Sequence, residues 1–242
     1  MSELAFLAWP FVAGLLVLAT HVPLGRLVLA RGIVFVDLAV AQVAGLGALI
    51  AHWLGWDGTI GVQAMALTAA LSSALLLTWT ERHFAPVQEA IIGTLFVGTA
   101  SLELVLLAYD AHGAAHLRDL LVGQVLWVEP RHLWPAAILA LAVPAAMRWT
   151  TALETRWVFY AVFAICITAS VQIVGIYLVF ASLIAPALGR WRPFAMGALG
   201  YAAGLAISAL TDLPAGPCIV LALICTAIAG ATIDMKLPPR SL

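Results

Sequence analysis

The sequence contains little charge. Only 10% of its 242 residues are Asp, Glu, Lys or Arg, and 64% are hydrophobic, whereas a soluble domain carries about 25% charged residues. This composition excludes an ordinary soluble domain and predicts an all-α, polytopic helical membrane protein in contact with membrane lipid. The net charge of −1 offers no basic surface for nucleic acid, so we expect no nucleic-acid partner.

Several chemical motifs are also missing. No Gly-x-x-x-x-Gly-Lys phosphate loop is present, so we expect no nucleotide site in this chain. Cys166, Cys218 and Cys225 lie in apolar runs without Cys-x-x-Cys spacing, which indicates core packing rather than disulfides or metal ligands. No apolar run carries a paired-histidine or serine/lysine constellation, which argues against an intramembrane enzyme. The N-terminus lacks the positive flank of a cleavable signal, so the first apolar run is expected to stay.

What the sequence has instead is a series of apolar runs, most of them near the roughly 20 residues that cross a bilayer. The run 157–189 is broken near Gly175 and at Pro186, and forms either two short spans or one span with a re-entrant segment. We predict 7–9 transmembrane helices in a single transmembrane domain over residues 1–242. The polar residues 109–131 would form a surface helix or a long loop. The other spans are predicted at about 4–22, ending at His21 and Pro23, and at about 33–54, 60–79, 88–108, 132–147, 194–211 and 216–234.

The basic residues predict the orientation. If the chain crosses nine times and begins outside, nine of its 11 Lys and Arg residues fall on the inner side, and only Arg118 and Arg131 fall outside. Cytoplasmic loops carry an excess of Lys and Arg. The sequence therefore predicts an external N-terminus and a cytoplasmic C-terminus.

The run 33–54 carries one carboxylate, Asp37. A charged side chain inside a membrane span costs about 3 kcal/mol on insertion scales, so it usually faces a partner or a polar pathway. The alternative is that Asp37 lies at the membrane edge and is hydrogen-bonded for structural reasons. The same run has small residues at spacings of three and four, which predicts a face for close helix packing. These are Ala41, Ala44, Gly45 and Ala48.

Two further acids and a histidine would lie at different depths. Asp37 and Glu89 are predicted near the inner surface, and His52 and Glu103 nearer the outer one. Carboxylate and imidazole groups are ligands for zinc and manganese, and interhelical acids also suit a proton relay. Glu89 has an alternative role as an N-terminal helix residue favoured by the helix dipole, and His52 as an interfacial residue.

The outer segment offers a second constellation. His112, His116 and Asp119 stand at i, i+4 and i+7, on one face if the segment is helical. Two histidines one turn apart chelate a divalent metal. The alternative is a solvated surface helix.

Four stretches of the sequence, residues 25–45, 89–96, 171–187 and 212–221, resemble the membrane subunit of metal-type ABC transporters, the zinc/manganese/iron permease family. Residues 25–45 are similar to the family's second-helix signature, a Leu-Arg-Arg entry followed by Gly-Asp-Ala-Leu-Ser-His-Ala. Residues 89–96 are similar to Asp-Thr-Ala-Ile-Gly-Ile-Leu-Phe, and 212–221 resemble the Leu-Asp-Leu-Pro-x-Gly turn before the last helix. The most specific stretch, 171–187, resembles Gln-x-Val-Gly-x-x-Leu-Val-x-Ala-Leu-Leu-Ile-x-Pro-Ala.

The resemblance implies a permease of the bacterial inner membrane that works as a homodimer, with a cytoplasmic ATPase subunit and an external metal-binding protein. The transported substrate would be a divalent metal ion, zinc or manganese, and no tightly bound cofactor is expected. ATP would be hydrolysed by the separate subunit, so the chain itself would not be an enzyme. Asp37 matches the family aspartate that lines the translocation path and coordinates metal.

The sequence departs from the family pattern in two places. Gln42 stands where the family has a histidine, and five residues instead of four separate it from Asp37, which places it about 140° around the helix. The outer histidines or His52 would then take over as ligands. The connector 148–156 is too short for the family's cytoplasmic docking helix, with its Phe-Asp-Pro-Glu pattern. A proton-coupled carrier using Asp37 and Glu103, or a membrane sensor or scaffold without ATP drive, therefore stays open.

The sequence thus gives two sets of candidate residues. The candidate translocation path contains Asp37, Gln42, Glu89 and Glu103, and the candidate metal ligands are Asp37, His52, His112, His116 and Asp119.

Overall fold

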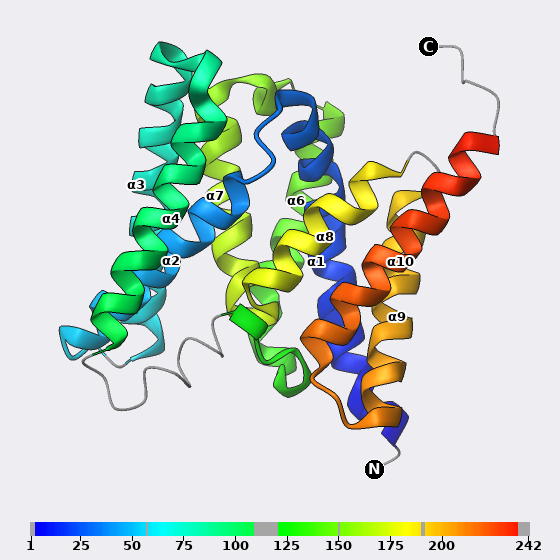
Figure 1. Ribbon diagram of the computed structural model, residues 1–242. Coiled ribbons are helices and arrows are strands. Elements are labelled where there is room, and N and C mark those ends of the chain that lie inside the picture. The colour runs from blue at the N-terminus through cyan, green and yellow to red at the C-terminus, as the bar shows by residue number, and fades with distance from the viewer. Residues whose placement is uncertain (1–2, 57, 109–120, 150, 190–191, 237–242) are drawn as a thin grey trace.

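The chain folds into a bundle of α-helices (Figure 1). The computed structural model describes residues 3–56, 58–108, 121–149, 151–189 and 192–236, and no strand occurs among them, which confirms the all-α prediction. The α-helices are α1 (Glu3–Arg31), α2 (Val36–Trp53), α3 (Thr59–His83), α4 (Gln88–Leu107), α6 (Trp134–Trp149), α7 (Arg156–Val174), α8 (Ile176–Leu188), α9 (Pro193–Thr211) and α10 (Ala215–Lys236). Short 3-10 turns are η1 (Ala85–Val87), η2 (Val125–Trp127), η3 (Pro130–His132) and η4 (Ala152–Glu154).

Seven of the described helices are long and apolar enough to cross a membrane, while α6 and α8 have only 16 and 13 residues. Successive helices run in opposite directions, and the two chain ends lie at opposite ends of the bundle (Figure 1). This agrees with the predicted 7–9 transmembrane helices and with an odd number of passes.

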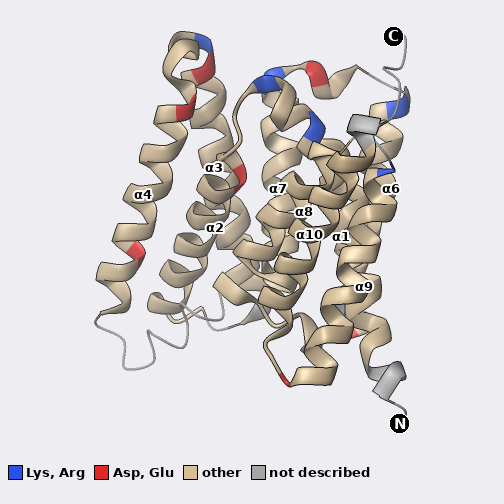
Figure 2. Ribbon diagram, turned by 45° about the vertical axis from the view of Figure 1, so that its right-hand side comes forward, with Lys and Arg blue, Asp and Glu red and all other residues tan. Residues whose placement is uncertain are grey.

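Basic residues distinguish the two ends of the bundle. Most blue segments in Figure 2 gather at one end, which we call the basic end. It carries Arg31, Arg82, Arg148, Arg156 and Arg192 at the inner-side boundaries predicted from the sequence. Helices α1, α3, α6, α8 and α10 finish there, and α2, α4, α7 and α9 begin there (Figure 1).

Exposed tryptophans mark both ends of the bundle. Near the basic end these are Trp79, Trp149 and Trp157, and toward the opposite end Trp9, Trp53, Trp56, Trp127 and Trp134. Tryptophan is enriched at both membrane–water interfaces because its ring is apolar and its N–H is polar. The two groups therefore bracket the part of the bundle that lies in lipid.

Helix α1 is longer than the sequence predicted. The expected end at His21 and Pro23 is wrong, because the helix continues to Arg31. The His21 ring is fully buried, and its Nδ1 lies 2.9 Å from the Val17 carbonyl oxygen. Pro23 removes one backbone donor, but the following turns bury Leu24 completely and pack Gly25 against the backbone of α8. Tertiary packing thus carries the helix past both expected stop signals.

A single residue, Gly175, separates α7 from α8. Its φ of 80° lies in the region that favours glycine, and a Cβ there would stand 2.4 Å from the Gly123 nitrogen. Gly123 also has a positive φ, of 70°. The backbone at Gly123 thus packs directly against the α7–α8 junction. The predicted break at Gly175 is confirmed, and residues 157–189 form two helices.

Pro186 does not end a helix, so the predicted break at this residue is wrong. Helix α8 continues through Pro186 to Leu188. The proline lacks the N–H that would otherwise reach the carbonyl oxygen of Ser182, so one bond of the helix is missing. Its ring is buried beside Gly197 of α9, where an added Cβ would meet the Pro186 Cγ at 3.3 Å. This packing keeps the final turn of α8 in place.

Helix α2 lies inside the bundle, and α3 and α4 form its edge (Figure 1). Of the α2 span 61% is buried, against 28% for α3 and 22% for α4. Ala41 and Ala44 of the predicted small-residue face are buried. Helix α2 approaches α3 closely at Gly47, where a Cβ would stand 2.7 Å from the Ala69 Cβ. Helices α3 and α4 therefore present their apolar outer sides to lipid and enclose α2 with their inner sides.

Candidate translocation site

The first turn of α2 places Asp37 inside the bundle near the basic end. It is the second residue of the helix, and its side chain is 1% exposed. The carboxylate interacts favourably with the backbone N–H groups of Asp37 and Leu38, as expected at a helix N-terminus. Neither oxygen has a hydrogen-bond partner of ordinary geometry among the described residues. A buried carboxylate without a partner is costly, which marks Asp37 as a candidate ligand.

Glu89, in the first turn of α4, reaches the start of α2. Its Oε1 accepts a hydrogen bond from the Phe35 backbone N–H at 3.2 Å, directly before α2 begins. The Glu89 and Asp37 carboxylates lie close enough to repel one another as like charges. The second Glu89 oxygen has no partner among the described residues. Two carboxylates at the starts of neighbouring helices suit a divalent cation or a shared proton.

Gln88 fixes the position of Glu89. Its side chain is buried, and its Nε2 donates to the Leu77 carbonyl oxygen at 3.2 Å and to the Tyr160 hydroxyl at 3.3 Å. These bonds tie the start of α4 to α3 and to α7. The sequence marked Gln88 only as the beginning of a span, because neither of its partners is near it in sequence.

Glu103 lies on the same helix, 14 residues after Glu89, which is about 21 Å along the axis. It is buried, while its neighbours Leu102 and Leu104 are about half exposed on the lipid side. Both of its carboxylate oxygens are unpartnered within the described part of the chain. Helix α4 therefore carries two acids on the side that faces the bundle, one near each end.

The other predicted residues do not join Asp37 and Glu89. His52 is exposed in the last turn of α2, at the opposite end of that helix. Gln42 is buried, but α2 is an unbroken α-helix, so its side chain leaves about 140° away from Asp37. His112, His116 and Asp119 lie outside the described residues. Within the described ranges, no group of three or more His, Cys, Asp or Glu could hold a metal ion.

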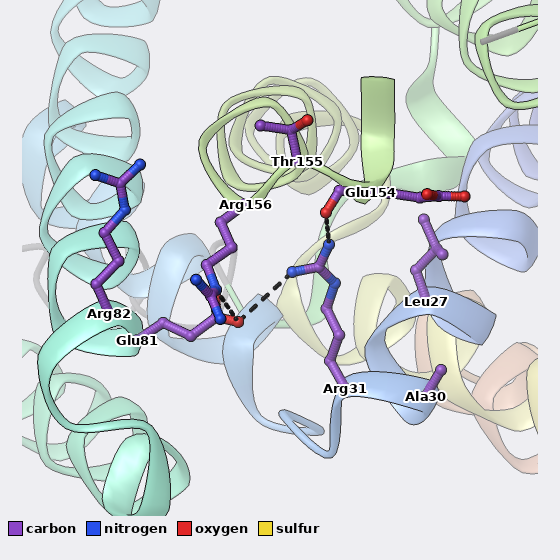
Figure 3. Close-up of a pocket in the computed structure, with 8 residues that line it drawn as sticks. All are labelled: Leu27, Ala30, Arg31, Glu81, Arg82, Glu154, Thr155 and Arg156. Atoms are coloured by element: carbon purple, nitrogen blue, oxygen red, sulfur yellow. Dashed lines mark hydrogen bonds and ion pairs between the residues drawn. The ribbon is translucent and has the colours of Figure 1, made fainter. Parts of the chain in front are cut away.

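A second charged cluster at the basic end was missed by sequence reasoning. Glu81 of α3 lies 3.2 Å from the Arg156 Nε and 3.7 Å from an Arg31 nitrogen. Figure 3 shows the two arginine side chains meeting at this carboxylate from different helices. The three residues are separated by 50 to 125 positions in the chain, and the sequence identified the arginines only as markers of orientation. We call Arg31, Glu81 and Arg156 the arginine clamp.

The short connector between α6 and α7 is held by the same clamp. Its middle forms the 3-10 turn η4, and the Leu153 side chain is buried. Arg31 donates hydrogen bonds to the carbonyl oxygens of Leu153 at 3.3 Å and Glu154 at 3.0 Å (Figure 3). The connector is therefore a turn fixed to α1, and it contains no α-helix among its described residues.

The pattern of the ABC 3 transport family matches this chain over residues 3–153 and 145–233. The chain belongs to the ABC 3 transport family. This confirms the resemblance seen in the sequence and makes the protein a multi-pass membrane permease subunit of an ABC-type transporter.

Curated relatives within the ABC 3 transport family extend the comparison. The chain is 24% identical over 228 residues to the manganese transport system membrane protein MntC of Halalkalibacterium halodurans, covering 82% of this chain and 77% of the relative. The manganese transport system membrane protein MntC of Listeria innocua is also 24% identical over 228 residues, with 82% of this chain and 80% of that protein covered. Both relatives are transport proteins, and neither name describes an enzyme.

A solved structure shows the same fold. PsaBC from Streptococcus pneumoniae, determined in complex with a Fab, superposes with a TM-score of 0.72 over 97% of this chain and 96% of that chain, at 17% identity. The arrangement of helices in this ABC 3 family member is therefore shared with a solved structure.

Proposed function

We propose that this permease moves a divalent metal ion, manganese in the first place, along a path that passes between Asp37 and Glu89. The observation that carries the proposal is the pair of carboxylates at the starts of α2 and α4, buried at Asp37 and half-buried at Glu89, with three oxygens that lack partners among the described residues. Two such groups leave a negative charge that a divalent cation would neutralise. Carboxylate oxygens are hard donors and suit manganese, whereas zinc prefers nitrogen and sulfur ligands. The manganese transport names of the relatives support the same ion.

We also propose which end of the bundle faces the cytoplasm and which partner proteins bind at each end. The excess of Arg residues supports a cytoplasmic location of the basic end. Asp37 and Glu89 would then lie near the inner exit of a path across a bacterial inner membrane. A separate ATPase subunit would dock at this end and hydrolyse ATP. An external metal-binding protein would deliver the ion at the opposite end, and two copies of the chain would form the permease.

A second candidate function rests on Glu103. A buried acid near the opposite end, together with the buried Asp37 and the half-buried Glu89 near the basic end, would also suit a proton-coupled carrier. The two functions differ in their energy source. Uptake that stops without the ATPase subunit supports the first, and uptake that stops with a protonophore while ATP is maintained supports the second.

The test of the proposed function is the substitution Asp37→Asn, which keeps the size of the side chain and removes its charge. Cells that express the chain with its ATPase and metal-binding protein should accumulate at least about tenfold less manganese with the variant, because a charged ligand is lost. Metal content is measured by mass spectrometry of washed cells, with zinc measured in the same samples. Wild-type cells that accumulate zinc alone would contradict the assignment of manganese.

Asp212→Asn is the matched control. Asp212 is exposed in the turn between α9 and α10, with a φ of 54° that asparagine also adopts readily. The same change of charge there should leave uptake unchanged. Equal uptake in the wild type and in Asp37→Asn would rule out the Asp37 path.

A further inference from the structure

A pocket of about 600 Å³ opens at the basic end, between the end of α1, the end of α3 and the start of α7. Leu27, Ala30 and Arg31 line it from α1, Glu81 and Arg82 from α3, and Arg156 from α7 (Figure 3). The pocket contains the arginine clamp but lies apart from Asp37 and Glu89, which do not line it. Nothing in the proposed transport path accounts for it.

The charge of the pocket is positive. Glu81 is shared by Arg31 and Arg156, so one carboxylate faces two guanidinium groups. Arg82 adds a third guanidinium, and its side chain points away from Glu81 (Figure 3). Glu154 contributes its backbone carbonyl to Arg31, and its side chain extends away from the clamp (Figure 3). The clamp and Arg82 therefore leave positive charge for an anion.

The exposed part of this charge lies on α3 and α7. Arg82 is exposed, and the Arg156 side chain is 51% exposed. Arg156 is also the first residue of α7, where the helix dipole adds positive potential to the guanidinium group. Arginine is the side chain best suited to planar, bidentate recognition of phosphate. The chemistry of the pocket thus favours a phosphate-bearing anion.

The depth of the pocket indicates where that anion comes from. Trp79 precedes Arg82 by one turn of α3, Trp157 follows Arg156 in α7, and both rings are about half exposed. Exposed tryptophans on membrane helices lie at the level of the lipid headgroups. Leu27 and Ala30 add an apolar wall beside the charged groups. A charged pocket with an apolar wall at headgroup depth matches an anionic phospholipid better than a soluble protein.

We propose that the pocket formed by the arginine clamp and Arg82 binds the phosphate headgroup of an anionic phospholipid of the inner leaflet. Basic pockets between transmembrane helices on the cytoplasmic side bind such headgroups. The bound lipid joins the ends of α1, α3 and α7 at the face where the connector to α7 is fixed. The site is independent of the metal that the permease transports.

The test counts bound lipids on the detergent-purified protein by native mass spectrometry, during titration with dioleoylphosphatidylglycerol or dioleoylphosphatidylcholine. The wild type should bind phosphatidylglycerol in preference. Arg82→Gln should weaken binding of the first phosphatidylglycerol about fivefold, as expected for one basic group near a lipid surface. Glu81→Gln should strengthen it, because the carboxylate that competes for Arg31 and Arg156 is removed. A purely structural role of Glu81 would not produce this gain.

Arg148→Gln is the matched control, since Arg148 is exposed at the basic end beside the exposed Trp149 but does not line the pocket. Thermal unfolding of each variant confirms that it is folded. Equal binding of the two lipids, or equal losses with Arg82→Gln and Arg148→Gln, would overturn the proposal. Full competition by inorganic phosphate at equal concentration would assign the site to free phosphate instead. Loss of ATPase co-purification with Arg82→Gln, without any change in lipid binding, would assign it to a protein interface.

Discussion

Near the basic end of the bundle, the acid Glu81 and the acid pair Asp37 and Glu89 differ in whether their negative charge is paired with a basic side chain. Glu81 lies within ion-pair distance of Arg31 and Arg156. Asp37 and Glu89 lie at the starts of α2 and α4 with no ion pair among the described residues, and three of their four carboxylate oxygens lack a hydrogen-bond partner there. The first arrangement joins three helices, because one carboxylate is paired with guanidinium groups from two other helices. The second leaves its charge available, as expected where a cation must bind and leave again.

The sharpest way to break this comparison is to neutralise both unpaired acids. The double variant Asp37→Asn with Glu89→Gln should reduce manganese uptake to the background level. If both acids serve one ion, the loss in the double variant should be smaller than the product of the two single losses, because contacting residues are not additive. Uptake by the two single variants and the double variant gives the coupling. Independent, multiplicative losses would place the acids at separate steps.

The next largest effect is a loss of stability caused by a substitution that leaves every acid unchanged. Gly175→Ala forces a Cβ into a position 2.4 Å from the Gly123 nitrogen, on a backbone with φ of 80°. We expect the free energy of unfolding to fall by about 3 kcal/mol or more. Thermal unfolding in detergent measures the loss. Gly98→Ala on α4 is the control, because an added Cβ there meets nothing within 4 Å, and it should be neutral or slightly stabilising.

Glu81→Gln tests the compensated acid. The change keeps the side-chain volume and leaves Arg31 and Arg156 without their shared carboxylate. The free energy of unfolding should fall by about 1–2 kcal/mol, whereas manganese uptake per folded molecule should stay within about twofold of the wild type. Thermal unfolding and uptake are measured on the same preparations. A collapse of uptake at unchanged stability would show that the two groups of acids do not differ in role.

The smallest effect is expected from Glu103→Gln. The substitution removes a buried carboxylate that has no partner among the described residues and keeps its shape. Stability should be unchanged or higher by up to about 1 kcal/mol, and uptake should change less than with Asp37→Asn. Complete loss of uptake would favour the proton-coupled carrier, in which Glu103 is an essential relay.

Much of the fold was predictable because it depends on local properties of the chain. The apolar runs fixed the spans, and the Lys and Arg residues fixed which ends share a side. The break at Gly175 was visible as a glycine in a long apolar run. The extension of α1 past Pro23 was not, because it depends on the burial of Leu24 and on contact between Gly25 and α8. The passage of α8 through Pro186 likewise depends on Gly197 of another helix.

For the candidate site, too, one part was predictable from the sequence and the other was not. The sequence by itself determined that this is a helical membrane protein and that Asp37, Glu89 and Glu103 are acids in apolar surroundings, since composition is readable residue by residue. Its resemblance to a known family added the expectation of a permease. Only the tertiary structure decided which of these acids meet. Asp37 and Glu89 come from different helices, and their link runs through a backbone N–H 54 positions from Glu89. The arginine clamp was likewise decided by folding, because helix packing brings distant charges together and a local sequence pattern does not record such pairings.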